Sequence, residues 1–277
     1  MAGKSLDGLS INLATVRRQW SFAEAVDACL RHGITTVCPW RDQIADTGLA
    51  EAARIVRSNG VRLTGLCRGG FFPAPDAEGR ARALDDNRRA VDEAAALGAD
   101  CLVMVCGGLP AGSKDLPEAR RMVTDGLAAL MPHARAAGVP IAIEPLHPMY
   151  AADRACVNSL GQALDIAEEI GGGGIGAAID VYHVWWEPDL AGQIARAGRM
   201  GAILAHHICD WLVPTRDLLN DRGMMGDGVI DLPGFRAMIE AAGFHGAQEV
   251  EIFSGDWWSR PGDEVLATCI ERFRSVC

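Results

Sequence analysis

The stretch AAGVPIAIE, residues 136–144, shows the local pattern that decides the fold of this chain. A helical pattern ends at Gly138, and glycine is the residue type that best adopts the left-handed conformation just past a helix end. The short apolar run that follows is typical of a buried parallel strand. The same junction recurs along the chain, at Gly33 before ITTV, Gly60 before VRLTGL, Gly98 before ADCLVMV, Gly174 before IGAAID and Gly243 before Phe244.

Amphipathic helical stretches alternate with these apolar runs, over residues 21–32, 48–58, 80–97, 116–137, 159–170, 188–199, 232–242 and 259–276. With further strands at 9–14 and 203–209, the pattern gives eight strands and eight helices without a Pro/Ser-rich linker. In a chain of 277 residues this predicts one domain over residues 1–277, a single (β/α)8 TIM barrel of the α/β class. The alternative is an open doubly wound sheet, which usually has a Gly-rich turn after its first strand. Residues 15–20 contain no glycine, which favours the barrel.

The composition argues against several functional classes. The formal net charge is −10, whereas a nucleic-acid footprint needs clustered Lys and Arg. The nine cysteines form no CxxC pair and several lie in apolar runs, so we expect reduced core thiols in a cytoplasmic protein. The first ten residues lack an apolar segment of signal-peptide length. No apolar run approaches the roughly 18–20 residues that span a bilayer, so we expect no membrane association.

Ionisable residues end four consecutive predicted strands. They are Glu144 after PIAI, Asp180 after GAAI with His183 three residues on, His206, His207 and Asp210 in ILAHHICD, and Glu249 and Glu251 in AQEVEIF. The carboxyl ends of barrel strands meet at one rim, where clustered carboxylates repel one another unless a proton or cation neutralises them. One bound divalent ion is the simplest way to neutralise these carboxylates. Ligands that are mostly carboxylates favour Mn²⁺, Mg²⁺ or Co²⁺, and Zn²⁺ also fits.

Strand alternation predicts which of these side chains point inward. His207 shares a face with the small Ala205, which suits a crowded barrel interior, and His206 lies on the other face. Glu251 is nearer the carboxyl end of its strand and is the predicted ligand. Glu249 lies about one layer deeper, where we favour a buried carboxylate held by hydrogen bonds over a ligand.

The motifs EPLH (144–147), DVYH (180–183), HHICD (206–210) and GDGVID (226–231) resemble the xylose isomerase-like barrel superfamily over essentially the whole chain. The resemblance implies a metal held by Glu144, Asp180, His207 and Glu251. It also implies that the two glutamates act as acid and base, and that His183 contacts substrate. The three-zinc endonucleases of this superfamily need additional histidines from the first half of the barrel. Only His32 precedes His133 here, which argues against nuclease activity.

Two positions depart from the ketose 3-epimerase pattern. Tyr150 replaces a glutamate, and Val213 replaces an arginine for which Arg216 is the nearest substitute. His147 resembles a branch that acts on more oxidised sugars, including 3-oxo-glycosides. These changes alter the predicted substrate pocket and leave the identity of the sugar open.

Three further residues are candidates for binding substrate. Arg68, in a glycine-containing stretch after a strand, could bind a hydroxyl or a carboxylate or pair with a rim acid. Trp40 could stack on a sugar, and Arg216 lies in the long segment 212–231. That segment is long for a βα loop, so it is either a lid or a contact between copies of a homo-oligomer.

The leading hypothesis is a divalent-metal-dependent sugar isomerase or epimerase. One of Glu144 and Glu251 would remove a proton next to a carbonyl, and an enediolate would be stabilised by the metal. A lyase or dehydratase that uses His147 or His183 as base is the enzymatic alternative. A sugar- or metal-binding subunit that needs a partner protein is the non-catalytic one. No nucleotide fingerprint is present, so no organic cofactor is implied.

Overall fold

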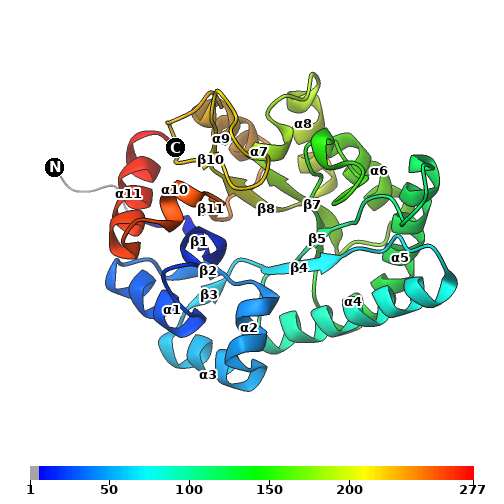
Figure 1. Cartoon of the computed structure of the whole chain (residues 1–277), viewed down its shortest axis with the longest axis horizontal. Coiled ribbons are helices and arrows are strands. Elements are labelled where there is room, and N and C mark those ends of the chain that lie inside the picture. Colours follow the sequence, from blue (N-terminus) through cyan, green and yellow to red (C-terminus); the bar gives the residue numbers. More distant parts are fainter. Residues whose placement is uncertain (1–5) are drawn as a thin grey trace.

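The computed structural model describes residues 6–277, and its parallel strands form a nearly closed barrel (Figure 1). The sheet has the order β3-β2-β1-β11-β8-β7-β6-β5-β4. The short strands β3 and β4 follow one another along the chain and together form one strand, or stave, of the barrel. The bounds are β1 Leu9–Asn12, β2 Thr36–Cys38, β3 Arg62–Leu63, β4 Leu66–Gly70, β5 Leu102–Val105, β6 Ile141–Ile143, β7 Ile175–Asp180, β8 Ile203–Ile208 and β11 Gln248–Val250. All pairs in this sheet are parallel, which confirms the predicted barrel.

Helices surround the strands (Figure 1). The bounds are α1 Phe22–Arg31, α2 Arg41–Thr47, α3 Leu49–Asn59, α4 Ala77–Leu97, α5 Leu116–Ala137, α6 Leu160–Ile170, α7 Val181–Val184, α8 Leu190–Met200, α9 Leu232–Ala241, α10 Gly255–Trp258 and α11 Gly262–Ser275, with 3-10 turns η1 Leu13–Val16 and η2 Pro148–Tyr150. The eight predicted helices are present within a few residues of their expected ends. The short α2, α7 and α10 were not predicted, because one or two turns carry too little hydrophobic periodicity.

The barrel strand predicted over residues 61–66 extends further along the chain than expected. After β3, the chain resumes as β4 and pairs with β5 as far as Gly70. Gly70 has φ +117°, and a Cβ there would lie 1.9 Å from the carbonyl oxygen of Val105. Only glycine therefore fits at this close approach of the two strands. The two glycines of LCRGG are typical of a turn, but here they allow this close approach within a strand.

Small side chains fill the interior of the barrel below its carboxyl end. They form one buried cluster of Cys38, Cys67, Cys101, Val103, Ala142, Ala178 and Ala205. All nine cysteines are free thiols and eight of them are buried, as expected for small core residues. The larger apolar side chains instead pack between the strands and the surrounding helices. The interior above the small residues is left to polar groups.

The loop after β8 folds into a small antiparallel hairpin of β9 Asp210–Trp211 and β10 Arg222–Gly223. Its position matters because Arg222 is buried while the intervening Val213 and Leu218 are exposed. The segment predicted as a lid or an interchain contact thus delivers an arginine to the interior.

Among residues 6–277, no helix is both long and apolar enough to cross a membrane. The expectation that the first ten residues contain no signal peptide concerns residues 1–5 in part, and these lie outside the described residues.

Candidate metal centre

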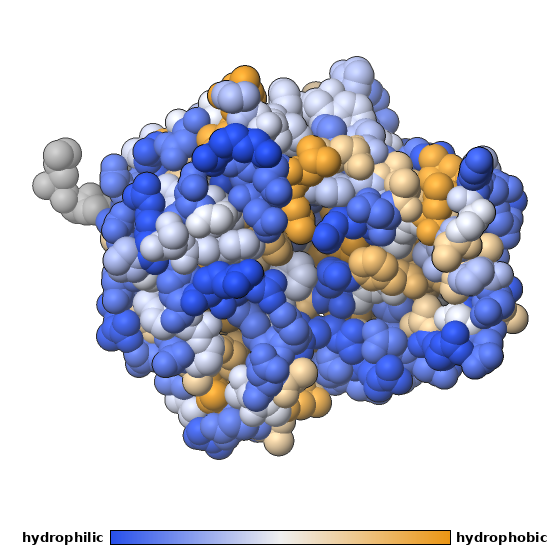
Figure 2. All heavy atoms as spheres, in the orientation of Figure 1, coloured by the Kyte–Doolittle hydropathy of each residue, from blue (hydrophilic) through white to orange (hydrophobic). Residues whose placement is uncertain are grey.

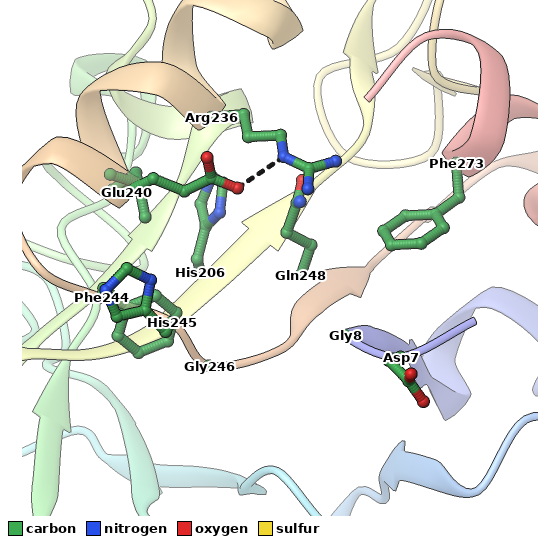
Figure 3. Close-up of a pocket in the computed structure, with 11 residues that line it drawn as sticks. Asp7, Gly8, His206, Arg236, Glu240, Phe244, His245, Gly246, Gln248 and Phe273 are labelled. Carbon is green, nitrogen blue, oxygen red and sulfur yellow. Dashed lines mark hydrogen bonds and ion pairs between the residues drawn. The ribbon is translucent and has the colours of Figure 1, made fainter. Parts of the chain in front are cut away.

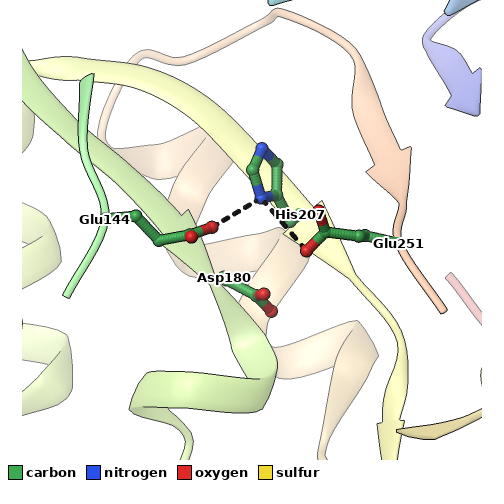
Figure 4. A group of neighbouring side chains, drawn as sticks. All are labelled: Glu144, Asp180, His207 and Glu251. Atoms are coloured by element: carbon green, nitrogen blue, oxygen red, sulfur yellow. Dashed lines mark hydrogen bonds and ion pairs between the residues drawn. The ribbon is translucent and has the colours of Figure 1, made fainter. Parts of the chain in front are cut away.

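Four side chains from consecutive staves meet at the carboxyl end of the barrel (Figure 4). Asp180 ends β7, His207 lies near the end of β8, and Glu144 and Glu251 directly follow β6 and β11. All four are buried, and one potential ligand atom from each lies within 4.8 Å of the others. The predicted set of Glu144, Asp180, His207 and Glu251 is therefore brought together by the fold.

Electrostatics shows why a cation suits this cluster. Burial raises the pKa of the Glu251 carboxyl to about 8, against the opposing effect of the Arg222 guanidinium. Burial would also raise the pKa of Asp180, but the charges of Arg222, His183 and His207, with a hydrogen bond from the Tyr182 N–H, together outweigh it and lower this pKa to about 2. Burial disfavours the charged imidazole of His207, yet neighbouring glutamates, chiefly Glu249, hold its pKa well above the usual range. Carboxylates so crowded and buried are stabilised by positive charge.

The donor set fits a divalent ion. Nδ1 of His207 lies 3.0 Å from Glu144 Oε1 and 3.8 Å from Glu251 Oε2, so three residues already face one point. Three carboxylates and one imidazole are the ligands that Mn²⁺, Mg²⁺ and Co²⁺ accept, and Zn²⁺ tolerates them. The described residues thus provide a buried cluster suitable for a metal.

The two adjacent histidines of β8 face opposite sides, as the alternation predicts. His206 lies on the outer face of the strand, in a cavity of about 250 Å³ bordered by Gln248 and by Arg236 and Glu240 of α9 (Figure 3). Burial lowers the pKa of His206 to about 3, and neither ring nitrogen has a hydrogen-bond partner among residues 6–277. His207 alone of the pair reaches the cluster.

Glu249 lies beneath the cluster, as expected. It accepts a 2.8 Å hydrogen bond from Asn12 Nδ2 and another from the Thr64 hydroxyl. Its Oε1 lies 3.4 Å from Nε2 of His207, the ring nitrogen on the side away from Glu144. A carboxylate behind the second nitrogen of a metal-binding histidine fixes the ring and its tautomer. Nε2 of His207 has no hydrogen-bond partner among residues 6–277, so Glu249 acts on the ring through its charge at 3.4 Å.

Arg222 is the residue of the site that sequence reasoning missed. Its Nη1 lies 2.8 Å from Asp180 Oδ2 and 2.9 Å from Glu251 Oε2. Its guanidinium also stacks on Tyr182 and Phe253, at 4.6 and 5.3 Å from the ring centroids. The β9–β10 hairpin positions it, and a two-residue strand leaves no periodic signal. The one available clue was an arginine beside the apolar pair that follows Gly223.

A cavity of about 200 Å³ opens beside the cluster. Its lining residues are Arg17, Trp40, Arg68, Val105, Glu144, Leu146, Tyr150, Arg154, His183, Leu219, Arg222, Glu251 and Phe253. Among the candidates for catalysis and substrate contact, Glu144, Glu251, His183, Arg68 and Trp40 line it. This volume is below the roughly 300–1,000 Å³ of sites for drug-sized ligands, which suits a small substrate.

Two sequence candidates do not line this cavity. Arg216 is largely exposed and pairs with Asp221 and, at 2.8 Å, with Asp256, because the hairpin turns it outward. The ring of His147 packs against Trp186 and Trp211, with centroids 5.5 and 5.1 Å away.

The backbone of His147 nevertheless orients His183. Its N–H donates to Nδ1 of His183 over 3.2 Å. Burial lowers the pKa of His183 to about 3, so the ring is neutral and one of its two nitrogens carries the proton. Nε2 lies 3.8 Å from Asp180 Oδ2 and 3.1 Å from Arg222 Nη2. Both ring nitrogens therefore face donors, the His147 N–H and the Arg222 guanidinium, and the neutral ring can accept from only one of them.

Two tyrosines tie the loop between β9 and β10 to the barrel. The hydroxyls of Tyr150 and Tyr182 both donate to the carbonyl oxygen of Leu218, the latter over 3.5 Å. Tyr150 thus borders the cavity and holds the loop beside it.

Comparisons with known proteins agree with this architecture. A crystal structure of protein SMc04130 from Sinorhizobium meliloti 1021 is 76% identical over 99% of both chains, with a TM-score of 0.97. A structure of the IOLI protein with a zinc atom has the same fold, with a TM-score of 0.84 and 22% identity over 97% of both chains. The curated inosose isomerase of Bacillus velezensis is 25% identical over 97% of this chain and 96% of its own length. The model of the xylose isomerase-like TIM barrel family matches residues 26–276, and the chain belongs to that family.

Proposed function

We propose that this chain is a divalent-metal-dependent isomerase or epimerase of a small sugar that carries a carbonyl group. The observation that carries the proposal is the convergence of two glutamates, one aspartate and one histidine beside a small cavity. The inosose isomerase and the zinc-containing IOLI structure support the activity and the metal, respectively. Buried free thiols support a cytoplasmic location, and we take residues 1–277 as one catalytic domain.

Glu144, Asp180, His207 and Glu251 would hold the ion. When bound, the ion supplies Lewis-acid polarisation of a substrate carbonyl, which acidifies the neighbouring C–H group. Mn²⁺, Mg²⁺ or Co²⁺ suits these ligands best, and Zn²⁺ remains an alternative.

Glu144 and Glu251 would move the proton. They approach the cavity from staves that β7 and β8 separate, so they reach a bound carbon from different sides. One carboxylate removes the proton next to the carbonyl, and the other, protonated, returns one to the opposite face or to the neighbouring carbon. The imidazole of His183 and the guanidinium of Arg222 would hold the substrate during the transfer.

The lyase alternative has less support in the geometry. Its proposed bases were His147, which lies outside the cavity, and His183. The low pKa of His183 makes its ring a poor base near neutral pH, and its Nδ1 already accepts a hydrogen bond.

A product assay in deuterated water tests the proposal. The Mn²⁺-loaded chain should convert an inosose, a ketose or a 3-oxo-glycoside to an isomer that contains solvent deuterium at the carbon that reacts. Release of water or an aglycone would support the lyase instead. Turnover that appears only after a second protein is added would support the subunit hypothesis.

Two variants test the residues. Glu144→Gln and Glu251→Gln each keep an oxygen ligand but remove a base, so turnover should fall roughly 10²- to 10⁴-fold while Mn²⁺ still binds measurably. The variant that lacks only the finishing acid should still exchange the substrate proton with solvent. Glu271→Gln on the exposed side of α11 is the control and should be active. Near wild-type turnover in both site variants would contradict the assignment.

A further inference from the structure

Two arginines at the cavity have no anionic partner. Arg68, on β4, stacks on Phe71 and Trp40, with centroids 4.3 and 5.9 Å from its Cζ. Arg154, in the turn after η2, lies 5.8 Å from the centroid of Tyr150. Within residues 6–277 neither guanidinium makes an ion pair or a hydrogen bond. Both line the cavity that contains Glu144 and Glu251.

The other two arginines of the cavity are already neutralised. Arg17 pairs with Asp42 outside it, and Arg222 pairs with Asp180 and Glu251 within the metal cluster. The whole chain has a net charge of −10, so two arginines in one cavity without an acidic partner stand out. Figure 2 shows the face of the molecule in view hollowed near its centre, with hydrophilic side chains beside the hollow.

Holding these two groups together costs free energy. Arg68 is only partly exposed, and burial together with the neighbouring charge of Arg154 lowers its pKa. Aromatic faces attract a cation but do not neutralise it. A half-buried guanidinium without a carboxylate is stabilised by an anion, because its planar fork binds carboxylate and phosphate oxygens through two parallel hydrogen bonds.

The charge balance with a bound ion points the same way. A divalent ion and Arg222 together carry +3, which offsets the carboxylates of Glu144, Asp180 and Glu251. Arg68 and Arg154 then leave an excess of positive charge at the cavity. We propose that the substrate carries a terminal carboxylate or phosphate that binds Arg68 and Arg154, while its carbonyl end faces Glu144 and Glu251. This inference rests on the proposed function and narrows its substrate class to an anionic sugar.

A binding measurement with unreactive probes tests the inference without turnover. The Mn²⁺-loaded full chain is titrated calorimetrically with D-glucitol, D-gluconate and D-glucitol 6-phosphate, which share a six-carbon chain and differ in their terminal group. At least one anionic probe should bind roughly tenfold or more tightly than glucitol, as expected for a hydrogen bond to a charged group. Whichever anion binds more tightly identifies carboxylate or phosphate. Equal affinity for all three probes would overturn the inference.

Substitutions separate the two arginines from the ion, which could bind an anion by itself. Arg68→Met and Arg154→Met should each remove most of the anion preference and leave Mn²⁺ affinity unchanged. Arg57→Met, at an exposed position on α3, is the control and should keep the preference. Because Arg68 packs on two rings, Arg68→Lys and the thermal unfolding of each variant show whether a loss reflects unfolding. A preference that survives both Arg68→Met and Arg154→Met in folded protein would overturn the inference.

The outcome is independent of the isomerase test. Turnover of a neutral inosose, together with equal binding of neutral and anionic probes, would leave the proposed function standing and remove this inference. Anion preference that depends on both arginines, without isomerisation of any sugar, would support anion binding by these arginines and contradict the proposed function.

Discussion

Replacing Glu249 with glutamine tests how the imidazole of His207 is held in the proposed metal centre. Oε1 of Glu249 lies 3.4 Å from Nε2 of His207, while Nδ1 of His207 faces the other ligands. In the wild type, the carboxylate favours the tautomer with the proton on Nε2 and leaves Nδ1 free for an ion. A neutral amide holds the ring less firmly and makes Nδ1 a weaker ligand.

The structure limits how much else this substitution disturbs. An amide oxygen can still accept from Asn12, and an amide N–H can donate to the hydroxyl oxygen of Thr64. The Thr64 hydroxyl also lies 2.9 Å from the hydroxyl of Ser10, so it can reorient its own proton. The packing around Glu249 should therefore survive, and the change should act on His207.

The expected magnitude follows from the distance. Loss of an outer partner of a metal-binding histidine weakens metal affinity roughly 10- to 100-fold. The 3.4 Å separation is longer than the about 2.7–2.9 Å of a short charge-assisted hydrogen bond, so we expect the lower end of this range. A tenfold loss corresponds to about 1.4 kcal/mol.

Competition with a chelator of known affinity measures the dissociation constant of Mn²⁺ for Glu249→Gln, the wild type and Glu271→Gln. In the Zn²⁺-loaded protein, the nitrogen chemical shifts of His207 report which ring nitrogen carries the proton. Unchanged Mn²⁺ affinity and an unchanged tautomer in the folded variant would refute the reasoning. A loss of affinity accompanied by unfolding would show that Glu249 supports the fold rather than the ring.

Four further predictions concern the proposed metal centre and the fold. Metal analysis should give one divalent ion per chain, and His207→Ala should weaken Mn²⁺ binding far more than His206→Ala; the opposite order would show that the ligand on β8 is misassigned. Burial raises the pKa of Glu187 from 4.5 to about 7, so its ionisation disfavours the folded state increasingly as the pH rises between these values. Glu187→Gln should therefore raise the melting temperature relative to the wild type at about pH 8 but not at about pH 4, and an equal difference at both would contradict this. Gly70→Ala should lower the melting temperature sharply, because its Cβ would overlap the carbonyl of Val105, and normal stability would mean that β4 and β5 are further apart than the structure shows.

The sequence was sufficient for the features that depend on local pattern. Glycine at helix ends followed by apolar runs predicted the staves, and alternation along β8 placed His207 inward and His206 outward. The side chains that meet at the rim follow from the fold, because parallel strands bring their carboxyl ends together.

Features that depend on long-range packing could not be predicted in this way. Arg222 reaches Asp180 only because the chain returns as β10 after a loop of ten residues that follows β9, and Arg216 is turned to the surface by the same loop. The unpaired state of Arg68 and Arg154 depends on which acids the fold keeps away from them. The sequence shows charges but not these distances.

The contact of Tyr150 and Tyr182 with Leu218 has a consequence for how this protein can diversify. Both hydroxyls bind the carbonyl oxygen, while the Leu218 side chain is 54% exposed. Every amino acid offers the same carbonyl, so residue 218 can change without releasing the loop from the barrel. Relatives could therefore vary the side chains at the rim, and with them the range of sugars admitted, while the loop keeps its anchor and Arg222 keeps its place.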